Sequence, residues 1–376
     1  MMARLEEICA INMGQSPDSS TYNEDGNGLP FFQGNADFGE IYPAVRMWCS
    51  EPTKIAREKD ILISVRAPIG ALNIANCECC IGRGLAALTV NEDICAQEYL
   101  WHVLSGKVDE LNSKGTGSTF KAINKKTLSE TEIPLPPIDE QRKIAAILDK
   151  VSDLIAKRRQ QLDTLDELVK ARFVEMFGDV IQNTKLWPQY IFSDITTSRL
   201  GKMLDAKQQT GMCQYPYLAN FNVQWFRFEL DNLNEMDFNE ADRIEFELRD
   251  GDLLVCEGGE IGRCAVWHNE IQPCYFQKAL HRVRCKKEIV LPDYLAWWFK
   301  YNCDNKGFAA IEGAKATISH LPGAKLKALL VSVPPIEQQK QFATFVEQTG
   351  KTKITISRSL DKLETLKKAL MQEYFG

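Results

Sequence analysis

Apolar residues recur every seven positions in the middle of the chain. The repeat consists of Leu148, Ile155, Leu162, Val169 and Met176. A second position of the same repeat is filled by Ile144, Val151 and Leu165, whereas it is interrupted by Arg158 and Arg172. Spacing by seven over about five heptads predicts one long helix that buries a narrow apolar stripe against a partner.

A second stripe of this kind lies at the end of the sequence. Its apolar members are Phe342, Val346, Ile356, Leu360, Leu363, Leu370 and Tyr374, and it is broken by Lys353 and Lys367. Two such stripes in one chain predict that the helices bury each other. Because a globular segment separates them, we expect an antiparallel coiled coil. The alternative is that each helix packs only on its own domain.

The two helical segments are copies of each other. Pro136-Pro137-Ile138-Asp139-Glu140-Gln141 returns 198 positions later as Pro334-Pro335-Ile336-Glu337-Gln338-Gln339, and Phe177-Gly178 returns as Phe375-Gly376. Proline suits a helix start, acidic residues suit the first turn, and glycine suits the stop. The chain therefore contains a duplicated unit with approximate two-fold geometry.

The segments outside the helices are also alike, although weakly. Gly14 aligns with Gly201, and Ile69-Gly70 aligns with Ile261-Gly262. Short β-branched runs bounded by Gly, Pro and Asn predict strands of a twisted mixed sheet, with helices near Gln97 to Leu111 and Pro292 to Tyr301. We therefore predict an α+β fold with two globular domains, residues 1–132 and 179–330, and two helical segments, residues 133–178 and 331–376.

Composition restricts the class of protein. The net charge is −6, so bulk electrostatics do not favour a protein that coats nucleic acid. The twelve cysteines have no framework spacing, the N-terminus lacks the pattern of a signal peptide, and no apolar run is long enough to cross a membrane. These features lead us to expect a cytoplasmic protein.

The order of motifs resembles the specificity subunit of type I restriction-modification systems. The motifs that carry the resemblance cover the whole chain: Ile133-Pro134-Leu135-Pro136-Pro137-Ile138-Asp139-Glu140-Gln141, Val333-Pro334-Pro335-Ile336-Glu337-Gln338-Gln339, Arg66-Ala67-Pro68-Ile69-Gly70, Gly115-Thr116-Gly117-Ser118-Thr119 and Gly313-Ala314-Lys315-Ala316-Thr317. The two copies differ at Glu140, which becomes Gln338, and at Arg66, which corresponds to Glu257 or Gly258. We therefore do not expect the two halves to make identical contacts.

The resemblance implies a subunit without catalytic activity of its own. Each globular domain is expected to be a target recognition domain that reads one half of a split DNA sequence. The helices are expected to be a spacer and the docking surface for two methyltransferase subunits. S-adenosylmethionine, ATP and Mg are expected only on partner subunits, which include a possible restriction subunit. No Asn-Pro-Pro-Tyr/Phe methylation motif and no Gly-x-x-x-x-Gly-Lys-Ser/Thr phosphate loop occurs in the sequence.

Two other functions remain open at this stage. The chain could be the specificity portion of a split single-chain restriction-methylation enzyme. It could also be a stand-alone coiled-coil DNA-binding protein without a methylase partner.

Candidate DNA contacts combine forked or cationic side chains with loops bounded by glycine. In the first half they are Gln33, Asn35, Arg66, Arg83, Lys114, Ser118, Thr119 and Lys121. In the second half they are Arg199, Lys202, Asn220, Asn222, Arg263, Gln277, Lys278, Lys315 and Thr317. For any one of them, a solvated surface residue is the simpler interpretation.

The candidate residues for the coiled coil and partner docking follow the repeat. They are Pro136, Pro137, Gln141, Leu148, Ile155, Leu162, Val169, Pro334, Pro335, Gln339, Val346, Ile356, Leu360 and Leu363. We predict no metal site, because Cys77 and Cys80 have Cys-x-x-Cys spacing but lack a second pair of ligands.

Overall fold

The computed structural model describes residues 1–117, 121–204, 209–309 and 320–376. The chain forms two compact units. Unit 1 consists of Met1–Gln160 and Ile356–Gly376, and unit 2 of Gln161–Thr355. Each unit combines one globular segment with parts of both long helices. Within the described ranges, no helix has the length and apolar character needed to cross a membrane.

Unit 1 is built on a four-stranded antiparallel sheet with the strand order β2-β10-β7-β8. These strands are β2 (Cys9–Met13), β7 (Ile61–Ser64), β8 (Leu72–Ile74) and β10 (Leu85–Val90). A second sheet has the order β3-β5-β4-β9-β6, in which β4 and β9 run parallel. Its strands are β3 (Tyr22–Asn23), β4 (Leu29–Phe32), β5 (Trp48–Cys49), β6 (Ile55–Ala56) and β9 (Cys79–Ile81).

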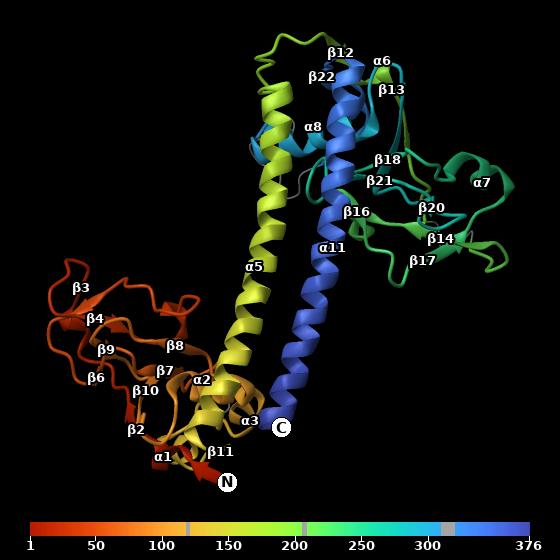
Figure 1. The fold of residues 1–376 in the computed structure, drawn as a ribbon. Coiled ribbons are helices and arrows are strands. Elements are labelled where there is room, and N and C mark those ends of the chain that lie inside the picture. Colours follow the sequence, from red (N-terminus) through yellow and green to blue (C-terminus); the bar gives the residue numbers. More distant parts are fainter. Residues whose placement is uncertain (118–120, 205–208, 310–319) are drawn as a thin grey trace. The chain divides into compact units, whose positions relative to one another are not determined.

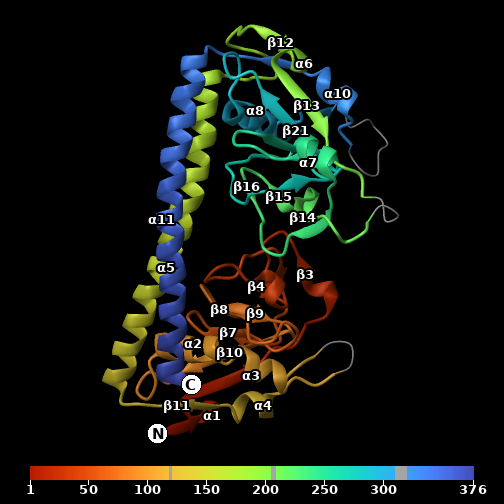
Figure 2. The same ribbon diagram turned by 90° about the vertical axis from the view of Figure 1, so that its right-hand side faces the viewer.

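Helices cover one face of the four-stranded sheet of unit 1. They are α1 (Leu5–Ile8), α2 (Gln97–Gly106), α3 (Val108–Ser113) and α4 (Lys125–Ser129), and a short strand pair joins β1 (Met2–Arg4) to β11 (Glu132–Pro134). The 3₁₀ turns are η1 (Ser19–Thr21) and η2 (Asn35–Asp37). Helix α2 lies beside β7 and β10 (Figure 2), where Tyr99, Leu100 and Val103 are fully buried among the strand residues. The main core of unit 1 therefore lies between α2 and this sheet.

Unit 2 repeats this arrangement. Its four-stranded antiparallel sheet has the order β13-β21-β18-β19. The strands are β13 (Thr196–Leu200), β18 (Leu253–Cys256), β19 (Cys264–Val266) and β21 (Leu280–Cys285). A smaller mixed sheet contains β14 (Gln214–Leu218), β17 (Asn234–Asp237) and β20 (Tyr275–Phe276), with β14 and β20 parallel.

The remaining elements of unit 2 are short, apart from one helix. They are the strand pairs β12 (Gln189–Ile191) with β22 (Leu330–Ser332) and β15 (Val223–Gln224) with β16 (Arg227–Phe228), the helices α6 (Phe192–Ile195), α7 (Glu240–Phe246) and α10 (Gly323–Lys327), and the 3₁₀ turn η4 (Asn220–Asn222). The longer helix α8 (Pro292–Asp304) contacts β19 and buries Tyr294 and Phe299 in the main core of the unit.

The aligned glycines Gly14 and Gly201 have the same structural role in the two globular segments, which explains why glycine occurs in both copies. A Cβ atom on Gly14 would lie 2.2 Å from the carbonyl oxygen of Gly82, and one on Gly201 would lie 2.3 Å from that of Gln277. Both distances are far below van der Waals contact, so only glycine allows the backbone to approach at these points. The predicted α+β fold with two related globular domains is thus confirmed.

The long helices are α5 (Ile138–Phe177) and α11 (Ile336–Phe375), each of 40 residues (Figure 1). In unit 1, an ion pair of 2.6 Å joins Arg159 of α5 to Glu364 of α11. In unit 2, Asp166 of α5 forms an ion pair of 2.5 Å with Lys353 of α11. Further along α5, the ring of Phe173 packs on that of Phe342, with the ring centroids 5.4 Å apart. Partners on α11 move towards lower numbers as α5 advances, so the predicted antiparallel pairing is confirmed.

A buried glutamine fixes the first turn of α5 to the globular part of unit 1. The Gln141 side chain is fully buried. Its Oε1 accepts a hydrogen bond of 2.9 Å from the amide of Ala96, and its Nε2 donates to the carbonyl oxygens of Ile94 at 3.1 Å and Pro136 at 2.8 Å. One side chain thus satisfies three backbone groups, the buried amide of Ala96 and the part-buried carbonyl groups of Ile94 and Pro136.

Gln339 makes the same contacts in unit 2. Its Oε1 accepts from the amide of Leu291 at 2.8 Å, and its Nε2 donates to Ile289 at 3.0 Å and Pro334 at 2.7 Å. The last residue of the Pro-Pro-x-x-x-Gln motif is therefore a structural latch in both copies. Neither amide is exposed, so the two glutamines that we predicted as docking candidates do not offer their side chains to a partner.

We expect the substitution Gln141→Leu to lower the free energy of unfolding of unit 1 by about 2 kcal/mol, because it leaves the buried amide of Ala96 and two part-buried carbonyl groups without their hydrogen bonds. Urea denaturation and hydrogen exchange at the Ala96 amide would measure this loss. The exposed Gln348 on α11 provides the control, and Gln348→Leu should change stability little. Equal effects of the two substitutions would contradict the latch.

Candidate nucleic-acid interface

Backbone hydrogen bonds bring several predicted DNA contacts of unit 1 to one end of its four-stranded sheet. The amide of Gly84 donates to the carbonyl oxygen of Gln33 at 3.1 Å, and the amide of Val65 donates to that of Gly84 at 2.9 Å. Arg66 then pairs with Ala122 in an isolated bridge. The turns that end β4 and β7 and the turn that precedes β10 therefore lie next to one another.

We call this end of unit 1 rim 1, and we define it by Gln33, Asn35, Arg66, Arg83 and Lys121. All of these side chains are exposed except that of Asn35, which is half-buried at the start of η2. Arg66 and Lys121 are held close, because the amide of Ala67 donates to the Lys121 carbonyl at 3.0 Å. Rim 1 thus carries three cations and two amides of the types that read base edges and phosphates.

The equivalent rim of unit 2 consists of Asn220, Gly258, Gln277 and Lys278, which we call rim 2. The amide of Gln277 donates to the carbonyl oxygen of Leu218, and the amide of Gly82 makes the same hydrogen bond to the carbonyl oxygen of Phe32. Gln277 is therefore the counterpart of Gly82, and the next residue, Lys278, is the counterpart of Arg83. Gly258 pairs with His320 as Arg66 pairs with Ala122, so Gly258 is the counterpart of Arg66. One exposed cation is common to both rims, Arg83 in rim 1 and Lys278 in rim 2, and the other two, Arg66 and Lys121, are present only in rim 1.

Several predicted contacts of unit 2 are instead engaged inside the protein. Lys202 donates to Asp242 and to the carbonyl oxygen of Asp237, both at 2.6 Å, and its side chain is largely buried. Asn222 is buried and joins the backbone of Ala219 to that of Glu229. The polar groups of these two predicted contacts are therefore engaged within the protein, where they hold the loops that carry rim 2.

Arg263 and Asn220 form an internal pair. The guanidinium of Arg263 donates to the Asn220 side chain at 2.6 Å and to its carbonyl oxygen at 3.1 Å, and only 17% of the Arg263 side chain is exposed. The Asn220 amide donates to the Gly258 carbonyl at 2.7 Å. Both side chains therefore hold the turn at Gly258 in place, and the amide of Asn220 is not free to read a base.

The other predicted contacts are engaged in ion pairs or lie outside the described residues. Lys114 is exposed but paired with Glu110 at 2.5 Å, and Arg199 on β13 is paired with Glu245. Ser118, Thr119, Lys315 and Thr317 lie outside the described residues. Across the described part of the chain, no cluster of His, Cys, Asp or Glu could hold a metal ion.

Most of the predicted docking residues of the helices are buried or half-buried. Leu148 is fully buried and Ile155 and Val169 are exposed by 7% and 5%, whereas Leu162, Val346, Ile356, Leu360 and Leu363 are half-buried. Pro136 is half-buried, Pro334 is buried, and Pro137 and Pro335 are exposed at the helix starts. The coiled-coil interpretation accounts for the apolar members of this set, and they leave little surface for a partner.

Sequence reasoning missed the apolar residues on the outer face of α5. In unit 1, Ile147 and Leu154 are exposed by 43% and 38%. They are also seven positions apart, each directly before a buried residue of the repeat, so a second and weaker heptad signal was present in the sequence.

Comparison with known proteins decides the family. A family model described as the type I restriction modification DNA specificity domain matches residues 1–166 and 185–367. The chain belongs to this family. The predicted resemblance is therefore confirmed, and both units contain regions that the specificity-domain model matches.

The chain is also similar to individual specificity subunits, over part of its length or in fold. The putative type I restriction enzyme MjaX specificity subunit of Methanocaldococcus jannaschii is 44% identical over 44% of this chain, and the chain spans only 39% of that relative. The HsdS subunit from Thermoanaerobacter tengcongensis is 52% identical over 42% of this chain and 38% of its own, with a TM-score of 0.39. The S subunit from M. genitalium is 12% identical but covers 100% of this chain and 96% of its own, with a TM-score of 0.63, which shows the same fold.

The engaged state of Lys202 can be tested in this specificity-domain protein. Lys202→Met leaves Asp242 without its cation, and we expect the free energy of unfolding of unit 2 to fall by about 3 kcal/mol. Hydrogen exchange of the β13 and β14 amides would report the loss. Lys278→Met, which removes an exposed cation close in sequence to β20, should leave this stability unchanged. A stable Lys202→Met protein with impaired DNA binding would return Lys202 to the interface.

Proposed function

We propose that the protein reads a bipartite duplex DNA target, with rim 1 facing one half-site and rim 2 facing the other. The observation that carries this proposal is the repeated rim, in which Arg83 and Lys278 occupy equivalent exposed positions on two copies of one fold. A shared cation suits phosphate contact at both half-sites, because phosphates are the same at every sequence.

The differences between the rims suit unlike half-sites. Rim 1 adds Arg66 where rim 2 has Gly258, and it has an exposed Gln33 where the equivalent turn of rim 2 begins with the buried Ala219. Arginine and glutamine are the side chains that pair with guanine and adenine in the major groove. The two rims therefore offer different hydrogen-bonding groups at the same place in the fold, and each half-site has its own reader.

The second part of the proposal concerns the helices. As in a specificity subunit, α5 and α11 would be a spacer and the surface on which two methyltransferase subunits dock. Ile147 and Leu154 are candidates for that surface in unit 1. The partners would supply S-adenosylmethionine and the methylation site, and a restriction subunit would supply the ATP- and Mg-dependent activity, so that this chain contributes recognition and no catalysis. A spacer of fixed length would hold the half-sites about one DNA turn apart.

Methylated adenines in the native genome, mapped before and after deletion of this gene, provide the direct test. We expect one motif of two short parts separated by unread base pairs to disappear. An unchanged pattern of methylation would contradict the proposal. If the split single-chain enzyme were correct, a methylation motif would be encoded directly beside the gene, and a stand-alone DNA-binding protein would not co-purify with any methyltransferase.

Isolated and assembled forms should bind DNA differently. Because the net charge is −6, we expect the purified chain to bind its target weakly and to gain specific affinity when the methyltransferase subunit is present. Fluorescence anisotropy with a duplex that contains the motif, with and without the partner, would measure the gain. Tight specific binding by the chain alone is the contrary result.

Removing the shared cation should weaken binding at both half-sites. We expect Arg83→Gln and Lys278→Gln each to lower affinity for the target duplex by roughly five- to tenfold, and each to reduce the slope of log affinity against log salt by about one. Lys59→Gln and Lys287→Gln are matched controls. Both lysines are exposed, and each lies at the end of its strand that is away from the rim, Lys59 before β7 and Lys287 after β21. Similar losses in the controls would show a general charge effect instead of contacts at the rims.

A further inference from the structure

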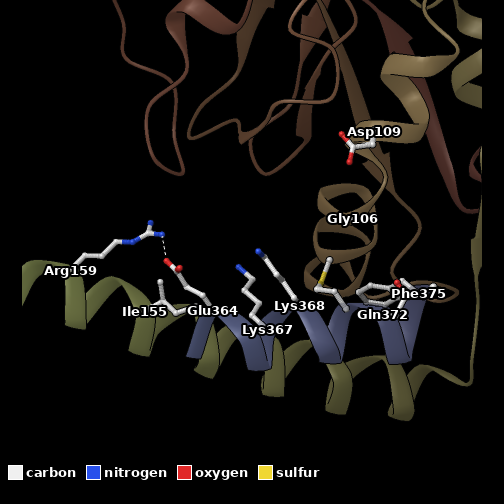
Figure 3. Close-up of a pocket in the computed structure, with 11 residues that line it drawn as sticks. Gly106, Asp109, Ile155, Arg159, Glu364, Lys367, Lys368, Gln372 and Phe375 are labelled. Carbon is white, nitrogen blue, oxygen red and sulfur yellow. Dashed lines mark hydrogen bonds and ion pairs between the residues drawn. The ribbon is translucent and has the colours of Figure 1, made fainter. Parts of the chain in front are cut away.

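Each unit contains a groove beside the end of one long helix. In unit 1 the groove has a volume of about 760 Å³, and it lies between the end of α2, the start of α3 and the last turns of α11 (Figure 3). In unit 2 a groove of about 210 Å³ lies between α8 and the last turns of α5. The two grooves are at equivalent places in the fold, as Tyr99 and Tyr294 show. Each tyrosine lies in the first turn of its helix, and its hydroxyl donates a hydrogen bond to a backbone carbonyl oxygen of the strand before the Pro-Pro pair.

The difference in volume follows from the side chains at equivalent positions. Gly106 of unit 1 corresponds to Tyr301 of unit 2, and His102 corresponds to Trp297. In unit 2 the ring of Phe173 packs between them, with ring centroids 5.8 Å from Tyr301 and 6.3 Å from Trp297. Aromatic rings thus fill in unit 2 the space that Gly106 leaves open in unit 1.

The charges of the two grooves also differ. In unit 2, Lys170 pairs with Glu167 at 2.8 Å and Lys300 with Asp304 at 2.6 Å, so both ammonium groups have carboxylate partners. In unit 1, among the residues that the structure describes, neither Lys367 nor Lys368 forms an ion pair, and both extend from α11 into the groove (Figure 3). The unit 1 groove therefore holds two cations whose charges are not neutralised within it.

The environment of Lys367 is unfavourable for a cation as it stands. Burial and the guanidinium of Arg159 lower the pKa of Lys367, and the carboxylate of Asp149 offsets this only in part. Arg159 itself is paired with Glu364 at 2.6 Å, so that carboxylate is already engaged. An anionic group placed between Lys367 and Lys368 would relieve the cost of burying the charge.

We propose that the unit 1 groove binds an acidic, partly apolar segment of a methyltransferase subunit, and that the smaller, internally neutralised groove of unit 2 binds its copy less tightly. The inference rests on the proposed docking function and makes the two docked copies unequal. A carboxylate of the segment contacts Lys367 and Lys368, and an apolar side chain enters the space beside Gly106.

The lining of the unit 1 groove favours a protein segment over DNA. Ile155, Met371 and Phe375 supply an apolar wall, on which a phosphate backbone finds no partner. Asp109 and Glu364 also line the groove, and their carboxylates would repel successive phosphates. A peptide that carries one carboxylate among apolar side chains can reach the two lysines and the apolar wall without placing a row of anions beside Asp109 and Glu364.

Titration of the full chain with the methyltransferase subunit of its own system tests the inference, with bound copies counted by native mass spectrometry at low and at high salt. We expect two binding steps, the first about tenfold tighter and more sensitive to salt. Lys367→Gln with Lys368→Gln should weaken the first step by about tenfold and bring the two steps together. Lys351→Gln with Lys362→Gln removes two exposed charges from the same helix outside the groove and should leave both steps unchanged.

Three outcomes would overturn the inference. Wild-type protein that binds two copies with equal affinity would show that the grooves are equivalent for docking. An unchanged first step in the Lys367→Gln, Lys368→Gln variant would remove the lysines from the contact. Loss of affinity for target DNA in that variant, with methyltransferase binding retained, would assign the groove to DNA. In contrast, if wild-type protein binds no methyltransferase subunit, the docking function itself fails.

Discussion

The connection between each long helix and its globular segment depends on one buried amide. Gln141 and Gln339 each join a loop, the strand end before Pro-Pro and the first helical turn through three hydrogen bonds. Because a primary amide both donates and accepts, no apolar side chain of similar size could satisfy all three groups. The direction in which the helix leaves its own globular segment is thus set at its first turn, and the apolar stripe further along is aligned by it.

The regular elements could be predicted well because their signals are local and repeated. The heptads from Leu148 to Met176, the Pro-Pro start and the Phe-Gly end predicted α5 almost to the residue, and the copy at Phe342 to Tyr374 did the same for α11. The hairpin at Trp225 and Phe226 was less predictable. These aromatic residues form the turn between β15 and β16, where Phe226 has a φ of +61° and stacks on Trp297.

The candidate site was harder to predict, because residue type does not show how a side chain is used. Arg83 and Lys278 are exposed as expected. Lys202 is also a cation in a loop, but it forms an ion pair with Asp242 and is largely buried. Asp242 lies 40 residues away, and the pairing exists only because α7 packs beside the loop. Similarly, the free charges of Lys367 and Lys368 become apparent only when the carboxylates around them are known in space.

The division of the chain into units has a consequence for its synthesis. Unit 2 is one continuous stretch, Gln161–Thr355, whereas the core of unit 1 is also packed against by the partly buried residues Leu370, Met371, Tyr374 and Phe375. On the ribosome, the first 160 residues emerge early, but they cannot complete their core until the final helix has been made. Domains usually fold in the order of synthesis. In this protein that order is reversed for completion, because unit 2 has all of its residues before the last residues that pack on unit 1 have been made.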